Sequence, residues 1–161
     1  MPEYAEGHGN AFGFSILGSK LEEFIQKTNE ILEGVEFSTS YKVDYIYKAW
    51  DVRERDILDI AALKPYWGQE LEEAMVAVES IDITANNIQL LGKGTVKILL
   101  PNGISIIKFN GEDIYNELFT ESGKTTINII ATCAINEFRG NISGQLKLVD
   151  YEIIRKLAYN F

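Results

Sequence analysis

MVAVESIDITANNIQLLG, residues 75–92, opens the part of the chain that decides the fold. It is followed by TVKILLPN (95–102), GISIIKFN (103–110), GEDIYNELF (111–119), TINIIATCAINEFRG (126–140) and NISGQLKLVDYEI (141–153). Within these segments side chains alternate, as Val96, Ile98 and Leu100 do with their neighbours. A period of two is typical of a strand that buries one face. GEDIYNELF instead predicts a short helix between the third and fourth strands.

The turns and one phase change complete this pattern. Asn102-Gly103 between alternating segments is a strong hairpin signal, and Arg139-Gly140-Asn141 joins the last two strands. In the first segment the apolar residues change parity near Ser80, which predicts a bulge or sharp bend there. Three strands, a helix and two strands, with a bent first strand, is the order of the OB barrel. We therefore predict an α+β protein with a five-stranded OB-like barrel.

Composition places the chain among globular proteins. Its 161 residues suffice for one ordinary domain or two small ones, with 46% hydrophobic and 24% charged residues. No apolar run approaches the length of a membrane span, and the acidic, polar N-terminus is not a signal peptide. The single cysteine, Cys133, excludes an intramolecular disulfide, and its place on the apolar parity of a strand favours a buried hydrophobe over a nucleophile. We expect a cytoplasmic protein without a membrane partner.

The charge is unevenly distributed. The net charge of −9 argues against bulk attraction to nucleic acid. However, residues 1–40 carry seven acids and two bases, whereas residues 75–161 carry nine acids and eight bases. The predicted barrel is therefore the least acidic part, and a local basic track on it is compatible with the total charge.

The N-terminal part reads as a small α/β unit. EGHGNAFGFSI (6–16) is rich in glycine, which permits close approach of the backbone to a ligand, and it ends in a short strand, residues 14–16. Ser19 and Glu22 predict a capping box for a helix over Leu21–Leu32, which Gly34 would close.

Residues 41–69 continue this unit. Alternation over Tyr41–Tyr47 predicts a strand, and Asp51 is a plausible cap for a helix over Val52–Leu63 that Pro65 terminates. We expect Lys64–Gln69 to be a packed hinge. The predicted domains are thus residues 1–74 and the barrel, residues 75–161.

Three motifs resemble the C-terminal part of RecJ-type single-stranded-DNA-specific exonucleases, which belong to the DHH phosphoesterase superfamily. Gly7-His8-x-x-Ala11-x-Gly13-Phe14 is similar to the glycine-histidine motif of the DHH-associated domain. Leu63-Lys64-Pro65-Tyr66-x-Gly68-Gln69 resembles the segment before the OB domain. Residues 135–140, INEFRG, with residues 145–151, resemble the last OB hairpin. The three occur in the family's order and span nearly the whole chain, so the set is more specific than any one motif.

The chain also departs from the family. Glu6 replaces the first glycine of the motif, and Glu70-Leu71-Glu72-Glu73 stands where the family has Asn-Pro-Glu-Pro. No Asp-His-His triplet is present, so the DHH domain that would hold catalytic Mn or Mg is missing. The resemblance therefore implies the non-catalytic, substrate-gripping region of a 5′-to-3′ single-strand exonuclease, inactive by itself. Its implied partners are single-stranded DNA and the DHH domain, and its implied context is DNA repair or recombination.

Two sets of residues are candidate sites. The resemblance implies that Gly7, His8 and, more weakly, Asn10 contact a substrate phosphate, since backbone N–H groups and an imidazole can cradle an anion. From the residues alone, a glycine turn with an incidental histidine is the favoured interpretation. The acidic residues fit solvated helix faces, so we predict neither a metal site nor catalytic residues in this chain.

On the barrel, single-strand binding needs cations for phosphates and aromatic faces for bases. The candidates are Lys97, Lys108, Phe138, Arg139 and Lys147. Arg139, on the tight turn between the last strands, is the strongest of them. Phe109 and Tyr151 are further aromatics on or near strand ends. The alternative is that Phe109 and Phe138 belong to the core and that the lysines only improve solubility. A protein-interaction or architectural OB module is the rival function, favoured by the acidic charge; a self-contained enzyme is disfavoured. Strand polarity, DNA against RNA, and oligomeric state stay open.

Overall fold

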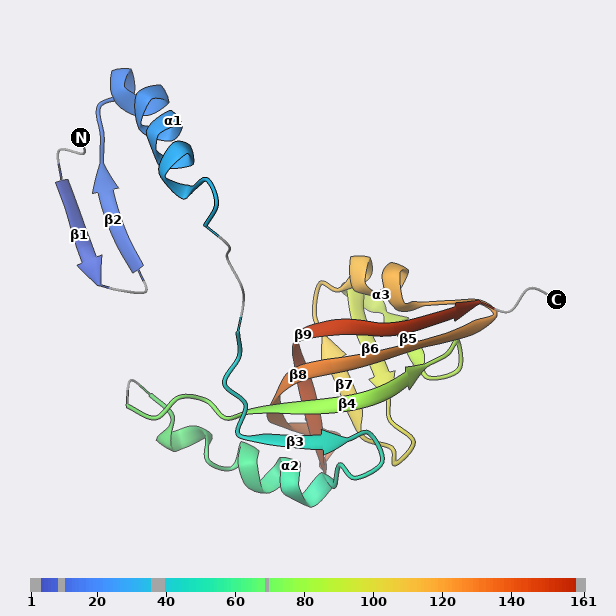
Figure 1. The fold of residues 1–161 in the computed structure, drawn as a ribbon. Coiled ribbons are helices and arrows are strands. Elements are labelled where there is room, and N and C mark those ends of the chain that lie inside the picture. Colours follow the sequence, from blue (N-terminus) through green and yellow to red (C-terminus); the bar gives the residue numbers. More distant parts are fainter. Residues whose placement is uncertain (1–3, 9–10, 36–39, 69, 159–161) are drawn as a thin grey trace. The chain divides into compact units, whose positions relative to one another are not determined.

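The computed structural model describes residues 4–8, 11–35, 40–68 and 70–158, and the chain forms two compact units, residues 1–40 and 41–161 (Figure 1). The division between units falls at Ser40/Tyr41 rather than between residues 74 and 75, where we predicted it. The reason is that residues 45–61 supply a strand and a helix that pack with the main sheet. Alternation along the chain cannot reveal that pairing.

The first unit is a β-hairpin followed by a helix. Strands β1 (Tyr4–His8) and β2 (Ala11–Ser15) pair antiparallel, and the 3₁₀ helix η1 (Gly18–Lys20) leads into α1 (Leu21–Leu32). The predicted helix is confirmed, and Gly34 follows it with a positive φ of 84°. The capping box is wrong: Ser19 lies inside η1, and Lys20 occupies the N-cap position without a side-chain hydrogen bond. A capping hydroxyl needs an extended backbone at its own residue, which the 3₁₀ turn removes.

The second unit contains one mixed sheet with helices beside it. In chain order its elements are β3 (Tyr45–Lys48), α2 (Glu54–Ala61), η2 (Lys64–Tyr66), β4 (Met75–Ile83), β5 (Ile88–Leu91), η3 (Gly92–Gly94), β6 (Thr95–Leu99), β7 (Ser105–Lys108), α3 (Glu112–Leu118), β8 (Gly123–Phe138) and β9 (Asn141–Ala158). Strand order across the described sheet is β3-β4-β8-β9-β7-β6-β5. Pairs β3–β4 and β7–β9 are parallel, and the other neighbours are antiparallel.

This order is that of an OB fold with an added edge strand. The predicted first strand, residues 75–92, is divided into β4 and β5, which lie towards opposite ends of the sheet. Asn87 lies in the loop between β4 and β5, and its side chain links β4 to β6. Its Nδ2 donates to the carbonyls of Asp82 in β4 (2.9 Å) and Leu99 in β6 (3.2 Å). The parallel edge strand β3 was predicted as a strand, but not as part of this sheet.

The predicted bulge is present in β4. Ser80 has a φ of 61°, the pairing with β8 shifts register between Val78 and Ile81, and the Ser80 N–H donates to Asn128 Oδ1 at 3.0 Å. The extra residue lets apolar residues of both parities point inward, so Val76, Val78, Ile81 and Ile83 are all buried. The Asn102-Gly103 hairpin is also confirmed, with β6 and β7 antiparallel and Gly103 at a φ of 88°.

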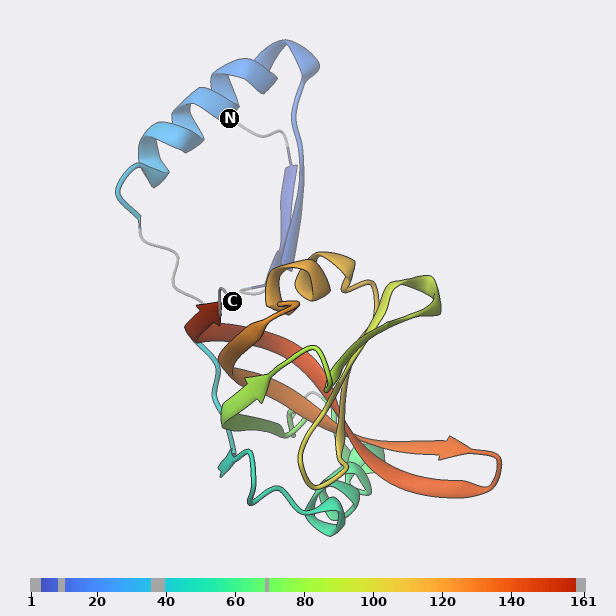
Figure 2. The ribbon, with the colours of Figure 1, turned by 90° about the vertical axis from the view of Figure 1, so that its right-hand side faces the viewer.

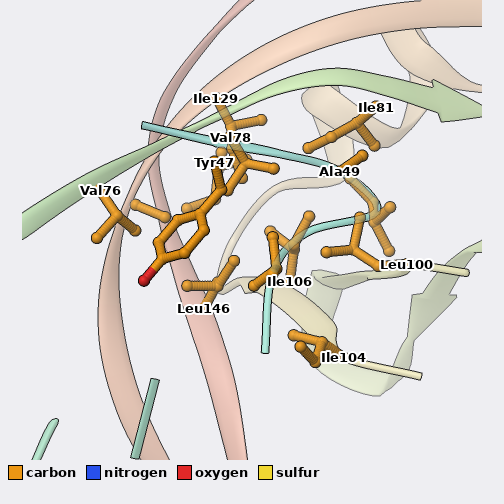
Figure 3. Packing of buried hydrophobic residues seen from close by; sticks show 14 of the residues in the cluster. Tyr47, Ala49, Val76, Val78, Ile81, Leu100, Ile104, Ile106, Ile129 and Leu146 are labelled. Carbon is orange, nitrogen blue, oxygen red and sulfur yellow. The ribbon is translucent and has the colours of Figure 1, made fainter. Parts of the chain in front are cut away.

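The core is built from aliphatic rows that cross the strands (Figure 3). One such row comprises Cys133, Leu146, Ile106, Ile98 and Ile88, which are successive register partners and all buried. The predicted burial of Cys133 is therefore confirmed, and burial raises the pKa of its thiol to about 11. Helix α2 adds the fully buried Ile57.

The segment between β3 and β4 differs from its prediction in two details. Helix α2 begins at Glu54, after Arg53 at the N-cap position, so Asp51 does not cap it. Residues 64–68 lie inside the second unit, so they are not a hinge between units as predicted, and Gln69 lies outside the described residues. The cause is again tertiary: α2 packs against β8 and β9, which places its start by side-chain burial rather than by a cap.

Candidate nucleic-acid interface

Two of the predicted lysines lie on one outer face of the sheet. Lys97 of β6 and Lys147 of β9 are both register partners of Ile107 in the strand between them. Paired residues of neighbouring strands share a face, so the two ammonium groups flank Ile107. With strands about 4.8 Å apart, their Cα atoms are about 10 Å from each other. Gln89 of β5, the partner of Lys97, extends the row.

Lys108 does not join this row. It is the register partner of the buried Val96, and its Nζ donates to the carbonyls of Leu148 and Val149 at 3.3 Å each. Val149 is the extra residue where β9 shifts register against β8. The Lys108 ammonium therefore satisfies backbone carbonyls at this bulge. The candidate contact predicted for Lys108 is not on the face of Lys97 and Lys147, because one step along a strand reverses the side chain's direction.

Phe138 and Arg139 lie at the end of a projecting hairpin, here called the arm, residues 135–144. Pairing of β4 with β8 ends at Met75–Thr132, and pairing of β7 with β9 starts at Ser105–Gln145. Within the described residues the arm therefore consists of β8 and β9 alone, and it extends beyond the rest of the sheet (Figure 2). Helix α2 packs on the base of the arm at Gly144, whereas Ile135, Phe138 and Ile142 further along the arm are exposed.

The tip of the arm has a defined geometry. Arg139 and Gly140 both have positive φ, 51° and 80°, as a two-residue type I′ hairpin requires. The guanidinium carbon of Arg139 lies 5.1 Å from the centroid of the Phe138 ring, within the range of a cation–π contact. The Phe138 side chain is 63% exposed. The predicted alternative that Phe138 is a core residue is therefore wrong.

Phe109, the other strand-end phenylalanine considered for base stacking, is also exposed, so the alternative that it is a core residue is wrong. It directly follows β7, two residues after Ile107, and its side chain is 62% exposed. Its loop touches the one that carries Lys93, since the Gly111 N–H donates to the Gly94 carbonyl at 2.8 Å.

Two other lysines on the sheet pair with acids. Lys124 Nζ lies 2.8 Å from Asp82 Oδ2, and this hydrogen bond is the main cause that lowers the pKa of Asp82. Lys48 pairs with Glu79. Among the ion pairs of the described residues, none engages Lys97, Lys147 or Arg139, which favours these three as contacts for an anionic ligand.

The glycine-histidine motif lies in the first unit. Gly7 and His8 belong to β1, where they pair with Phe12 and Ala11 across the hairpin. Asn10 lies outside the described residues. The described residues of the motif thus lie in the two strands of a hairpin, and phosphate binding by Gly7, His8 and Asn10 stays a prediction.

Two kinds of feature are missing from the described part of the chain. No group of three or more His, Cys, Asp and Glu side chains there is placed to hold a metal ion. None of its helices has the length and apolar character that crossing a bilayer demands.

A family model, the RecJ OB domain, matches residues 43–150. The chain belongs to the RecJ OB domain family. The match covers the whole sheet from β3 to the middle of β9, including the row of Lys97 and Lys147 and the arm. The OB fold and the predicted kinship with the C-terminal region of RecJ are thereby confirmed.

Two curated relatives extend the similarity to the N-terminal unit. Both carry the name single-strand DNA-specific exonuclease YorK, one from the SPbeta prophage of Bacillus subtilis (strain 168) and one from Bacillus phage SPbeta. Each is 30% identical over 157 residues, which cover 95% of this chain and 27% of the relative. The chain thus spans about a quarter of the length of these relatives.

Solved structures of RecJ from Thermus thermophilus share the fold. The Mn²⁺ complex matches with a TM-score of 0.63 and 14% identity, covering 94% of this chain and 22% of that one. The Mg²⁺ complex matches with a TM-score of 0.59 and 12% identity, covering 93% and 23%. At these identities the likeness establishes the fold alone.

Proposed function

We propose that this chain is the non-catalytic, DNA-gripping region of a RecJ-like 5′-to-3′ single-strand exonuclease, serving a DHH phosphoesterase domain outside these residues. One observation carries the proposal: Lys97 and Lys147 flank Ile107 on an outer face, and the same sheet carries the stacked Arg139–Phe138 pair at its arm. These are the two kinds of group that a single strand needs, cations for its phosphates and a π-surface for its bases.

Catalysis and substrate binding are assigned to different domains because they need different chemical groups. Phosphodiester hydrolysis in the superfamily relies on metal ions that activate water and stabilise the leaving oxygen. We assign Mn or Mg to the DHH domain and substrate grip to this chain, with Gly7, His8 and Asn10 as further phosphate contacts. A cytoplasmic role in DNA repair or recombination belongs to the same proposal.

A protein-interaction module is the second candidate, and a specific observation favours it. Ile135 and Ile142, on the arm, are 50% and 64% exposed, and the whole chain carries a net charge of −9. Exposed aliphatic residues on a projecting arm suit a protein surface better than a phosphate backbone.

Fluorescence anisotropy with labelled oligo-dT at low and moderate salt tests the proposal. We expect salt-dependent binding by the whole chain, weakened by Arg139→Ala and by Phe138→Ala, since stacking contributes about 1–3 kcal/mol per base. Lys97→Ala and Lys147→Ala should each reduce the salt slope by about 0.7.

Arg55→Ala is the matched control, because Arg55 is an equally cationic, exposed residue on α2. Equal binding by the control and all four variants would refute the assigned face. Absence of binding at low salt would refute single-strand grip by this chain and favour the protein-interaction role.

A further inference from the structure

The two faces of the arm carry different side chains. Pairing of β8 with β9 is unbroken along the arm, so register partners, and every second residue of each strand, lie on the same face. Thr132, the partner of Lys147, places one of these faces in line with the row of Lys97 and Lys147. We name this side of the arm, beyond the row, the amide face, and its residues are Ala134, Asn136, Phe138, Asn141, Ser143 and Gln145.

The amide face offers hydrogen bonds and no negative charge. Three of its side chains are amides, and Asn136 Nδ2 donates to Ser143 Oγ at 3.2 Å across the two strands. The whole chain has 24 acids among 161 residues, but between residues 126 and 149 Glu137 is the only one. Its parity places it on the opposite face of the arm. A polyanion on the amide face therefore meets neutral donors and acceptors between two cationic ends, Lys147 and Arg139.

The opposite face of the arm suits such a ligand less well. It carries Ile135 and Ile142, which are 50% and 64% exposed, and Glu137, the register partner of Ile142. Its base is covered by α2, because a Cβ at Gly144 would lie 3.1 Å from the Glu54 carbonyl oxygen. The Glu54 carboxylate also accepts the Gly144 N–H at 3.1 Å. Exposed aliphatic side chains and two carboxylates are poor contacts for a phosphate backbone.

We propose that a single strand of DNA follows the amide face from the lysine row to the tip of the arm, with its bases against the amides between these ends. This inference rests on the proposed function and adds to it a path, a set of intermediate contacts and a minimum length of strand. Amide side chains present a donor and an acceptor together, as the edges of bases do. Lys147 and Arg139 supply the phosphate contacts at the two ends, and Phe138 supplies the stacking surface.

The length of this path sets how much strand is needed. Six residue steps along β9 separate Lys147 from Asn141, the partner of Phe138. At about 3.4 Å per residue this is a distance of about 20 Å. A strand of about six nucleotides covers that distance if its phosphates keep the helical spacing of about 3.4 Å, and an extended strand needs fewer. This length lies within the roughly 4–16 nucleotides that OB folds occupy.

A length series of labelled oligo-dT, from about three to about twelve nucleotides, tests this minimum with the whole chain. We expect anisotropy at low salt to show a steep rise in affinity up to about six nucleotides and a shallow one beyond, because only a strand that reaches both ends gains from two linked contacts. Phe138→Ala removes the contact at the tip and should flatten the rise. An even increase in affinity over the whole series would overturn the joint use of the two ends.

Two adjacent substitutions locate the path. Ser143→Asp puts a negative charge on the amide face, and Ile142→Asp puts the same charge on the opposite face, so net charge and position along the arm are matched. Ser143→Asp should weaken binding of the longest strand about fivefold at low salt, the factor for one pair of charges about 4 Å apart in water, and less at higher salt. Ile142→Asp should change the affinity by less than about twofold, since the arm separates its charge from the strand.

Asn136→Asp, on the paired strand of the amide face, should act as Ser143→Asp does and replaces it if thermal melts show that Ser143→Asp is unfolded. Equal weakening by the charges on the two faces, or weakening by neither, would refute this path and leave the proposed grip intact. If the native chain binds no oligo-dT at low salt, the grip and the path both fail. The two failures are therefore distinguishable.

Discussion

The two units of this chain contain similar aliphatic residues, but these are buried in the second unit and exposed in the first. In residues 41–161, aliphatic side chains from six strands and α2 meet in one core, and residues such as Ile57, Ile129 and Val78 are exposed by 1% or less. In the first unit, isoleucine and leucine at proper helical spacing remain 41–77% exposed along α1. The comparison shows that an apolar stripe predicts a helix, but burial depends on what the fold brings opposite it. Stability of the isolated chain should accordingly reside in the second unit.

The largest expected difference comes from truncating equivalent side chains in the two helices. Ile57→Ala removes a fully buried side chain between α2 and the sheet, and should lower the free energy of unfolding by about 2–4 kcal/mol. Ile25→Ala in α1 should change it by less than about 0.5 kcal/mol, since the site is half exposed. Urea denaturation of both variants gives the measurement. Similar losses would mean that the first unit is part of the same cooperative core.

A smaller difference is expected between two glycines in strands. A Cβ at Gly144 would lie 3.1 Å from the Glu54 carbonyl oxygen and 3.1 Å from the Ile57 side chain, so Gly144→Ala should cost about 1–2 kcal/mol. Gly13 in β2 has no neighbouring atom within 4 Å of the same position, so Gly13→Ala should be close to neutral. Thermal melts of the two variants compare them directly. A neutral Gly144→Ala would show that α2 packs more loosely than its contacts indicate.

The smallest expected effect comes from ionisation of the Cys133 thiol, which does not change the folding stability at neutral pH. Burial raises the pKa of its thiol from 9.0 to about 11, so near pH 8 it should react with a thiol reagent only as the chain unfolds. A thiol introduced by Ile25→Cys should react rapidly under the same conditions. As pH rises from about 9 to about 11, the unfolded thiol ionises first, so folding stability falls over that range.

Cys133→Ala provides the reference for this pH effect. Its unfolding free energy should fall less than that of the native chain between pH 9 and pH 11, because other groups still titrate but this thiol does not. Rapid labelling of Cys133 in the native protein at pH 8 would contradict its burial.

Local patterns predicted the local features of this fold. The bulge at Ser80, the turn at Gly103 and the burial of Cys133 each follow from alternation or turn chemistry within a few residues. The helix over Leu21–Leu32 was found for the same reason. All four follow from the pattern of residue types over a short segment of the chain.

What the sequence could not predict depends on contacts between distant segments. The pairing of β3 with β4, and the packing of α2 on Gly144, join residues more than 25 positions apart. Lys108 was predicted to lie with Lys97 and Lys147, although within its own strand it shares the parity of the buried Ile106. Its actual role could not be predicted because the bulge whose carbonyls bind its ammonium is formed by a distant strand, β9. The predicted caps, Ser19 and Asp51, failed since packing and a 3₁₀ turn moved the helix starts.

The position of β9 has a consequence for synthesis of the protein. This last strand of the described chain lies between β8 and β7, and so joins one half of the sheet (β3, β4 and β8) to the other (β7, β6 and β5). While the ribosome is still adding residues 141–158, the two halves have no strand to connect them. Folding of the sheet must therefore wait until nearly all of these residues have left the ribosome, and until then the inner edges of β8 and β7 are open to chaperones or to wrong partners.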